Sequence, residues 1–119
     1  MRQIVIDEIS KSEIEEVERY LKNNTEPAAI GGMFWVKIPT DLLAEAQQGH
    51  EECGPFVFGV ELGDDSIKFE LLVRSRSNLH CSCTSYADKG QREFLLSFVV
   101  YMLFYNLVPS EISLWSIIY

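Results

Sequence analysis

The stretch FLLSFVVYMLFYNLV, which runs from Phe94 to Val108, decides the fold of this chain. Thirteen of its fifteen residues are apolar or aromatic, and none carries a charge. Fifteen residues are too many for an ordinary strand, and as a helix they span about 22 Å, less than the roughly 30 Å of bilayer hydrocarbon. Because a helix that is apolar on all sides is usually buried, we predict a long central helix and no membrane span. One side should lie on a sheet, and the other should be covered by another part of the chain or by a second copy.

Length and composition indicate one acidic globular domain, residues 1–119. A hydrophobic fraction of 47% is typical of a chain with a packed core. The 18 acidic and 10 basic residues give a net charge of −8, which argues against a nucleic-acid partner because phosphate contacts need a basic face. Three cysteines, an odd number, fit a reducing compartment better than a disulfide framework. The N-terminus has acidic residues where a signal peptide needs an apolar core, so we expect a cytoplasmic protein.

Two shorter helices are expected besides the central one. Ser10 stands three residues before Glu13, which is the spacing of a capping box, and predicts a helix that ends near Asn23 or Asn24. A second short helix is predicted over Asp41–Gln48, where a glycine follows directly.

Alternating apolar and polar residues, bounded by turn residues, predict the strands. Phe56 to Arg76 should form a hairpin with its turn at Gly63 to Ser66. The other predicted strands are Gln3–Ile6, Met33–Ile38, Leu79–Tyr86 and Glu111–Tyr119. Because several strands follow one another without a helix between them, the fold class is α+β. We expect a largely antiparallel sheet of about five to six strands packed on the long apolar helix, with its strand order left open.

Each of the two histidines stands close to cysteine, as in a metal site. His50 and Cys53 form an HxxC pattern, and His80, Cys81 and Cys83 form HCSC. Structural zinc needs four such ligands. If residues 79–86 are a strand, His80 points away from Cys81 and Cys83, so a site would have to combine His50 and Cys53 with those two cysteines. We favour small buried cysteines and predict no metal or other cofactor, with a zinc-binding domain as an alternative.

A cysteine nucleophile is a further alternative. Cys83 lies a few residues before the central helix and near basic residues, two surroundings that activate a thiolate. A cysteine-dependent enzyme or redox protein would use Cys83 or Cys81, and a histidine partner for Cys83 would have to be His50. No catalytic sequence motif supports this hypothesis.

Residues 74–92 form the candidate site that we would test first. This stretch has four basic residues and one acidic residue in an otherwise acidic chain. Basic side chains, hydroxyl groups and a helix N-terminus together suit a phosphate or a carboxylate. The alternative is a solvent-exposed strand whose arginines pair with glutamates. The candidate ligand- or partner-binding residues are Arg74, Arg76, His80, Ser82, Thr84, Tyr86, Lys89 and Arg92.

The sequence thus favours a small acidic binding or interaction domain without catalytic function. We predict a homodimer, because the uncharged central helix and the apolar last strand carry more apolar surface than one copy can cover. No motif identifies the ligand or the partner.

Overall fold

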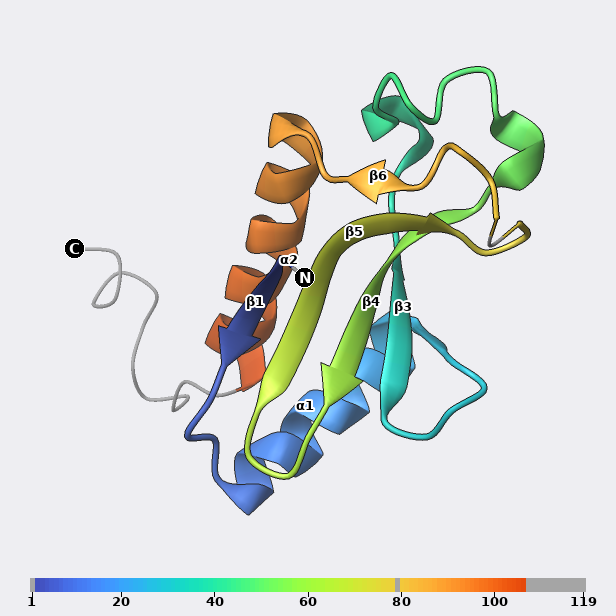
Figure 1. Ribbon diagram of the computed structural model, residues 1–119. Coiled ribbons are helices and arrows are strands. Elements are labelled where there is room, and N and C mark those ends of the chain that lie inside the picture. Colours follow the sequence, from blue (N-terminus) through green and yellow to red (C-terminus); the bar gives the residue numbers. More distant parts are fainter. Residues whose placement is uncertain (1, 79, 107–119) are drawn as a thin grey trace.

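The computed structural model describes residues 2–78 and 80–106 of the chain (Figure 1). Within these residues an antiparallel sheet has the strand order β1-β5-β4-β3-β2, and β6 also pairs with β5. The strands are β1 (Gln3–Ile6), β2 (Glu26–Pro27), β3 (Met33–Lys37), β4 (Phe56–Leu62), β5 (Ile67–Ser75) and β6 (Ser85–Tyr86). The α-helices in the same residues are α1 (Lys11–Asn24) and α2 (Lys89–Asn106). The predicted α+β class and the antiparallel sheet are confirmed.

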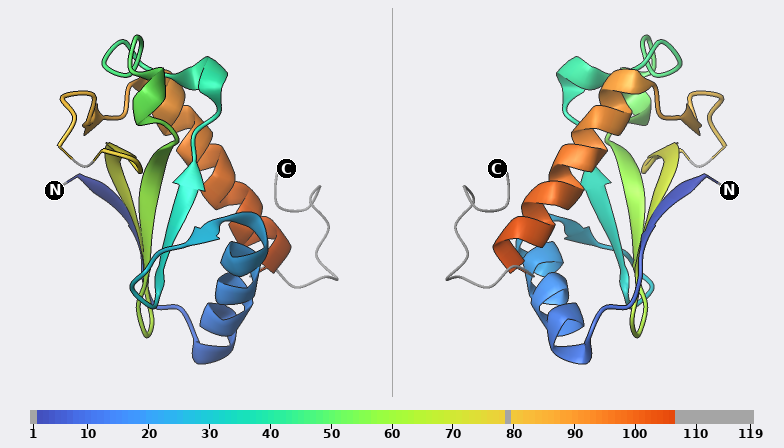
Figure 2. Two further views of the ribbon diagram at one scale, coloured as in Figure 1. Left: turned by 90° about the vertical axis from the view of Figure 1, so that its right-hand side faces the viewer. Right: turned by 90° about the vertical axis from the view of Figure 1, so that its left-hand side faces the viewer.

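Both α-helices lie on one face of the sheet, and the core lies between the two layers (Figure 2). Phe58 and Phe69 of the sheet are completely buried, as are Leu95 and Met102 of α2. Burying an aliphatic or aromatic side chain of this kind stabilises the fold by about 1.5–3 kcal/mol.

Helix α1 begins where the sequence predicts. The Ser10 hydroxyl accepts a hydrogen bond from the backbone N–H of Glu13 at 3.2 Å, and the Glu13 carboxylate accepts one from the backbone N–H of Ser10 at 3.0 Å. This capping box satisfies two N–H groups that a helix start leaves without partners. Val17 and Leu21 of α1 are buried, and the helix ends at Asn24, one of the two predicted positions.

Helix α2 is covered on one face only in the part of the chain that the structure describes. Leu95 and Val99 are buried, whereas Leu96 is 48% exposed and Val100 47%. Among these residues the sheet and α1 cover a single face of α2, and cover of its other face by a second copy of the chain stays a prediction. No helix among residues 2–78 and 80–106 combines the length and the apolar character that a bilayer crossing requires.

The second short helix, predicted over Asp41–Gln48, is not an α-helix. Only a 3-10 turn, η1 (Thr40–Leu42), forms there, and a second one, η2 (Glu51–Cys53), precedes β4. Leu43 has an extended backbone, and the side chain of Gln47 accepts the N–H of Ala44. The side chain thus takes the place of a helical backbone partner.

The strand predicted over Leu79–Tyr86 is also wrong, since among the described residues 80–86 only Ser85–Tyr86 form a strand. The backbone N–H groups of Cys81 and Thr84 donate to the carbonyls of Asn78 and Cys81, both at 3.2 Å, so this segment turns. The Asn78 side chain also accepts the N–H of His80, which is the local chemistry that makes asparagine a turn residue. The predicted strand Glu111–Tyr119 and the last two residues of the predicted central helix lie outside the described residues.

The β4–β5 hairpin is confirmed, and β5 bends in the middle (Figure 1). The pairing of β4 with β5 shifts between Phe58 and Val60. Before the bend β5 pairs with β1, and after it Leu72 and Val73 pair with β6. The bend therefore brings the loop that precedes β6 to the end of the molecule where η2 lies.

Candidate metal centre

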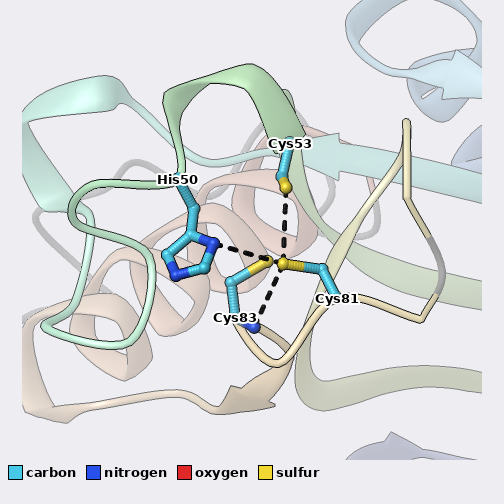
Figure 3. Close-up of side chains that lie close together, drawn as sticks. All are labelled: His50, Cys53, Cys81 and Cys83. Carbon is cyan, nitrogen blue, oxygen red and sulfur yellow. Dashed lines mark hydrogen bonds between the residues drawn. The ribbon is translucent and has the colours of Figure 1, made fainter.

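Two irregular segments meet beyond the open end of the β4–β5 hairpin. One is His50 with η2, ahead of β4, and the other is the turn between β5 and β6. Together they bring the side chains of His50, Cys53, Cys81 and Cys83 to one point (Figure 3). The ligand atoms of these four residues all lie within 4.8 Å of one another.

The spacing of these atoms suits a single tetrahedral ion. The Cys81 Sγ lies 3.3 Å from the Cys53 Sγ and 3.3 Å from the His50 Nδ1. Zinc with sulfur ligands at about 2.3 Å and a nitrogen ligand at about 2.0 Å holds them about 3.5–3.8 Å apart. Shifts of about 1 Å or less would place all four donors at zinc distance.

Cys53 is fixed to the end of β5. Its carbonyl accepts a hydrogen bond from the buried hydroxyl of Ser75, and its N–H donates to the carbonyl of His50 at 2.9 Å. The Ser75 hydroxyl also accepts the N–H of Asn78 at 2.9 Å. One serine therefore ties the segment that carries Cys53 to the segment that leads to Cys81.

Cys83 is fixed by a buried pair of glutamines. The Gln47 Nε2 donates to the Cys83 carbonyl at 2.8 Å and to the Ser85 hydroxyl at 3.1 Å. Its Oε1 accepts from the Gln91 Nε2 at 3.0 Å, and both glutamine side chains are completely buried. Gln91 belongs to the first turn of α2 and exchanges two hydrogen bonds with Asp88. The position of Cys83 is thus coupled to the start of α2.

The three thiols differ in burial and in proton affinity. Burial raises the pKa of Cys83 to about 12, and the hydrogen bond that Cys53 donates to Cys81 raises the pKa of Cys53. Hydrogen bonds from Cys83 lower the pKa of the half-buried Cys81 to about 7. Without a metal, Cys81 is therefore the thiol that ionises most readily, and a cluster with three thiolates is disfavoured. A bound cation would favour the thiolate form of all three, since metal binding displaces thiol protons.

Several residues of the predicted anion site contact different partners instead of one another. Arg74 donates to Glu70 at 3.0 Å and Arg76 pairs with Glu26, and both arginines line a cavity of about 230 Å³ beside Trp35. Both arginines therefore pair with glutamates, as the alternative interpretation of this stretch as a solvent-exposed strand expects.

The other residues of that set lie elsewhere or make other contacts. Arg92 donates to the carbonyl of Ala87 at 3.0 Å, and the guanidinium of Arg2 lies 4.6 Å from the ring centre of Tyr86. His80, Ser82 and Lys89 are exposed, and Thr84 is half-buried. An acidic ligand near Arg74 and Arg76 stays a prediction.

The four residues of this cluster are the set that a metal site would need according to the sequence, although no metal was predicted, and no sequence pattern indicated Gln47 or Gln91. A buried glutamine has no sequence signature, and its exposed neighbour Gln48 is the same residue type.

The chain matches no family model, no curated protein and no solved structure. The site is therefore interpreted from its own geometry and chemistry.

Proposed function

We propose that the protein is a small non-catalytic interaction domain whose fold is held together by one structural zinc ion. The ligands are His50, Cys53, Cys81 and Cys83. The observation that carries the proposal is that four zinc-type donors from two distant segments converge within 4.8 Å. Structural zinc sites have four protein ligands, whereas catalytic ones keep a position open for water or substrate.

The donor set favours zinc over the other common divalent ions. Mg²⁺ and Ca²⁺ prefer oxygen ligands, whereas three thiolates and one imidazole form a soft, tetrahedral set typical of zinc. Thiolate ligands must also stay reduced, which supports the expected cytoplasmic location.

The ion would stabilise the part of the fold with the least regular structure. None of the four ligands belongs to a strand or an α-helix, and Cys53 lies in the short 3-10 turn η2. Zinc contributes about 10–16 kcal/mol of apparent binding energy in small zinc-folded peptides, against a total stability of about 5–15 kcal/mol for an ordinary domain. Loading of the site should therefore decide whether this end of the molecule is ordered.

Elemental analysis of tag-free protein tests the proposal. We expect about one zinc per chain, lost on substitution Cys53→Ser, Cys83→Ser or His50→Ala. His80→Ala is the matched control, because His80 is exposed and outside the cluster, and it should keep its zinc. Cobalt added to the metal-free protein should give the absorption bands of tetrahedral cobalt thiolate. A protein that purifies without zinc and binds neither zinc nor cobalt would refute the proposal.

A cysteine-dependent enzyme is the second candidate, and the geometry favours Cys81 as its nucleophile. Cys81 is half-buried with the His50 Nδ1 at 3.3 Å, whereas Cys83 is completely buried. Thiol labelling separates the two functions. A thiol of the zinc-loaded native protein that reacts rapidly would favour the enzyme, and labelling that begins only after chelation would favour structural zinc.

A homodimer is part of the proposed interaction role. Two copies that each carry a net charge of −8 repel one another, so they should meet through a face without charge. The exposed side of α2 with Leu96 and Val100 is such a face, because α2 has no charged residue after Glu93. Light scattering should find a dimer, and a monomer at high concentration would contradict this.

A further inference from the structure

We propose that oxidation regulates this site: a peroxide joins Cys53 and Cys81 in a disulfide and so expels the zinc ion. The release of zinc rests on the proposed function, whereas the disulfide depends only on the arrangement of the thiols. The inference identifies the oxidisable pair among three neighbouring cysteines.

The separation of the two sulfurs selects this pair. The Cys53 and Cys81 Sγ atoms lie 3.3 Å apart, and a disulfide of about 2.05 Å needs an approach of about 1.2 Å. Cys53 ends the 3-10 turn η2 and Cys81 lies in the turn before β6. Neither residue belongs to a strand or an α-helix, so this approach breaks no ladder of backbone hydrogen bonds.

Accessibility makes Cys81 the first thiol to be oxidised. Cys81 is half-buried, whereas Cys53 is 5% exposed and Cys83 is completely buried. Cys83 is also held through its carbonyl by Gln47. A disulfide between Cys81 and Cys83 would have to close a ring across the single residue Ser82, which disfavours the usual disulfide geometry. Cys53 is therefore the thiol that attacks oxidised Cys81.

The reaction balances with hydrogen peroxide as the two-electron oxidant. The Cys81 thiolate attacks one peroxide oxygen, the O–O bond breaks, and the departing hydroxide takes a proton to become water. The Cys81 sulfur is then a sulfenic acid. The Cys53 thiolate attacks that sulfur, the S–O bond breaks, and a second hydroxide takes a proton. Two thiolates, one peroxide and two protons give one disulfide and two water molecules.

Loss of the zinc ion follows from the loss of ligands. A disulfide removes two of the four donors and leaves only His50 and Cys83. A dithiol reductant returns two electrons to the sulfurs, restores both thiolates and allows zinc to bind again. The site would thus lose and regain its metal as the surrounding redox state changes.

Peroxide treatment of the zinc-loaded full-length protein tests the inference. A chromogenic chelator measures released zinc, and mass spectrometry of peptides identifies the disulfide. We expect about one zinc released for each Cys53–Cys81 disulfide formed, and recovery after a reductant and zinc are added. Zinc release with a Cys81–Cys83 disulfide, or with sulfinic acid and no disulfide, would overturn the inference.

Two further samples separate this inference from the proposed zinc site. Metal-free wild-type protein prepared with a chelator, and Cys83→Ser, both keep the Cys53–Cys81 pair and should form the same disulfide. A Cys53–Cys81 disulfide in a protein that never binds zinc would support the pairing and refute the zinc function. Stoichiometric zinc that peroxide does not release, with both thiols still reduced, would support the zinc function and refute the redox inference.

Discussion

Replacing Gln47 by leucine tests whether the buried glutamine pair positions the ligands of the proposed metal centre. Leucine has a similar size and keeps the site apolar, but it can neither donate nor accept a hydrogen bond. In the native protein Gln47 donates to the Cys83 carbonyl and accepts from the Ala44 N–H and the Gln91 Nε2, at 2.8, 2.9 and 3.0 Å respectively. Gln47→Leu therefore leaves these three buried groups, and the half-buried Ser85 hydroxyl as a fourth, without this partner.

The cost can be worked out from those three groups. A buried polar group without a partner costs about 1–3 kcal/mol, which gives about 3–9 kcal/mol in total. The buried leucine side chain offsets about 1.5–3 kcal/mol of this. The difference spans about 0–7.5 kcal/mol, and we expect a net loss near its middle, about 4 kcal/mol, which lowers the melting temperature of a domain of this size by more than about 10 °C. Because Cys83 loses its anchor, zinc affinity should also fall about 10–100-fold.

The assay compares Gln47→Leu with Gln48→Leu, the same change at the exposed neighbouring position. Urea unfolding is measured with and without zinc, and zinc affinity by competition with a chelator. Equal stability of the two variants, within about 0.5 kcal/mol, would refute the role of the glutamine pair. A destabilised Gln47→Leu with unchanged zinc affinity would show that Gln47 supports the fold without positioning Cys83.

Three further predictions concern the helices. Leu95→Ala should cost about 3 kcal/mol in urea unfolding and Leu96→Ala less than about 1 kcal/mol, because Leu95 is completely buried and Leu96 is 48% exposed. Ser10→Ala should cost about 1 kcal/mol by removing the helix cap. The hydrogen bond from the Ser10 backbone lowers the pKa of Glu13, so the Glu13 carboxylate stabilises the fold at pH 7 and loses this contribution as the pH falls through its lowered folded-state pKa. Glu13→Ala should therefore destabilise the protein at neutral pH, and this effect should shrink progressively as the pH falls below the usual glutamate pKa of about 4.3.

The sequence predicts those parts of the fold that local chemistry decides. The capping box at Ser10 and Glu13 and the turn at Gly63 to Ser66 depend on neighbouring residues, and both form as expected. The helix predicted over Asp41–Gln48 fails because Gln47 is used in a long-range contact with Cys83, 36 residues away. A local pattern cannot show that a side chain is needed elsewhere.

Helix α2 shows a different limit. The sequence predicts its existence, but the uncharged stretch does not reveal which of its faces the sheet covers. Leu95 and Leu96 are adjacent and identical, yet one is buried and the other is half exposed. The two side chains point in different directions around the helix axis. Only the tertiary structure shows which direction faces the sheet.

The sequence carries a further signal for the proposed metal site. In an antiparallel hairpin the residue that opens the first strand lies beside the residue that closes the second, and Phe56 indeed pairs with Ser75. Residues shortly before Phe56 and shortly after Ser75 must then lie near one another, whatever the rest of the fold does. The HxxC pattern ends three residues before this pair and the HCSC pattern begins five residues after it. Two half-sites that flank a predicted hairpin therefore indicate a shared site more strongly than the spacing within either half.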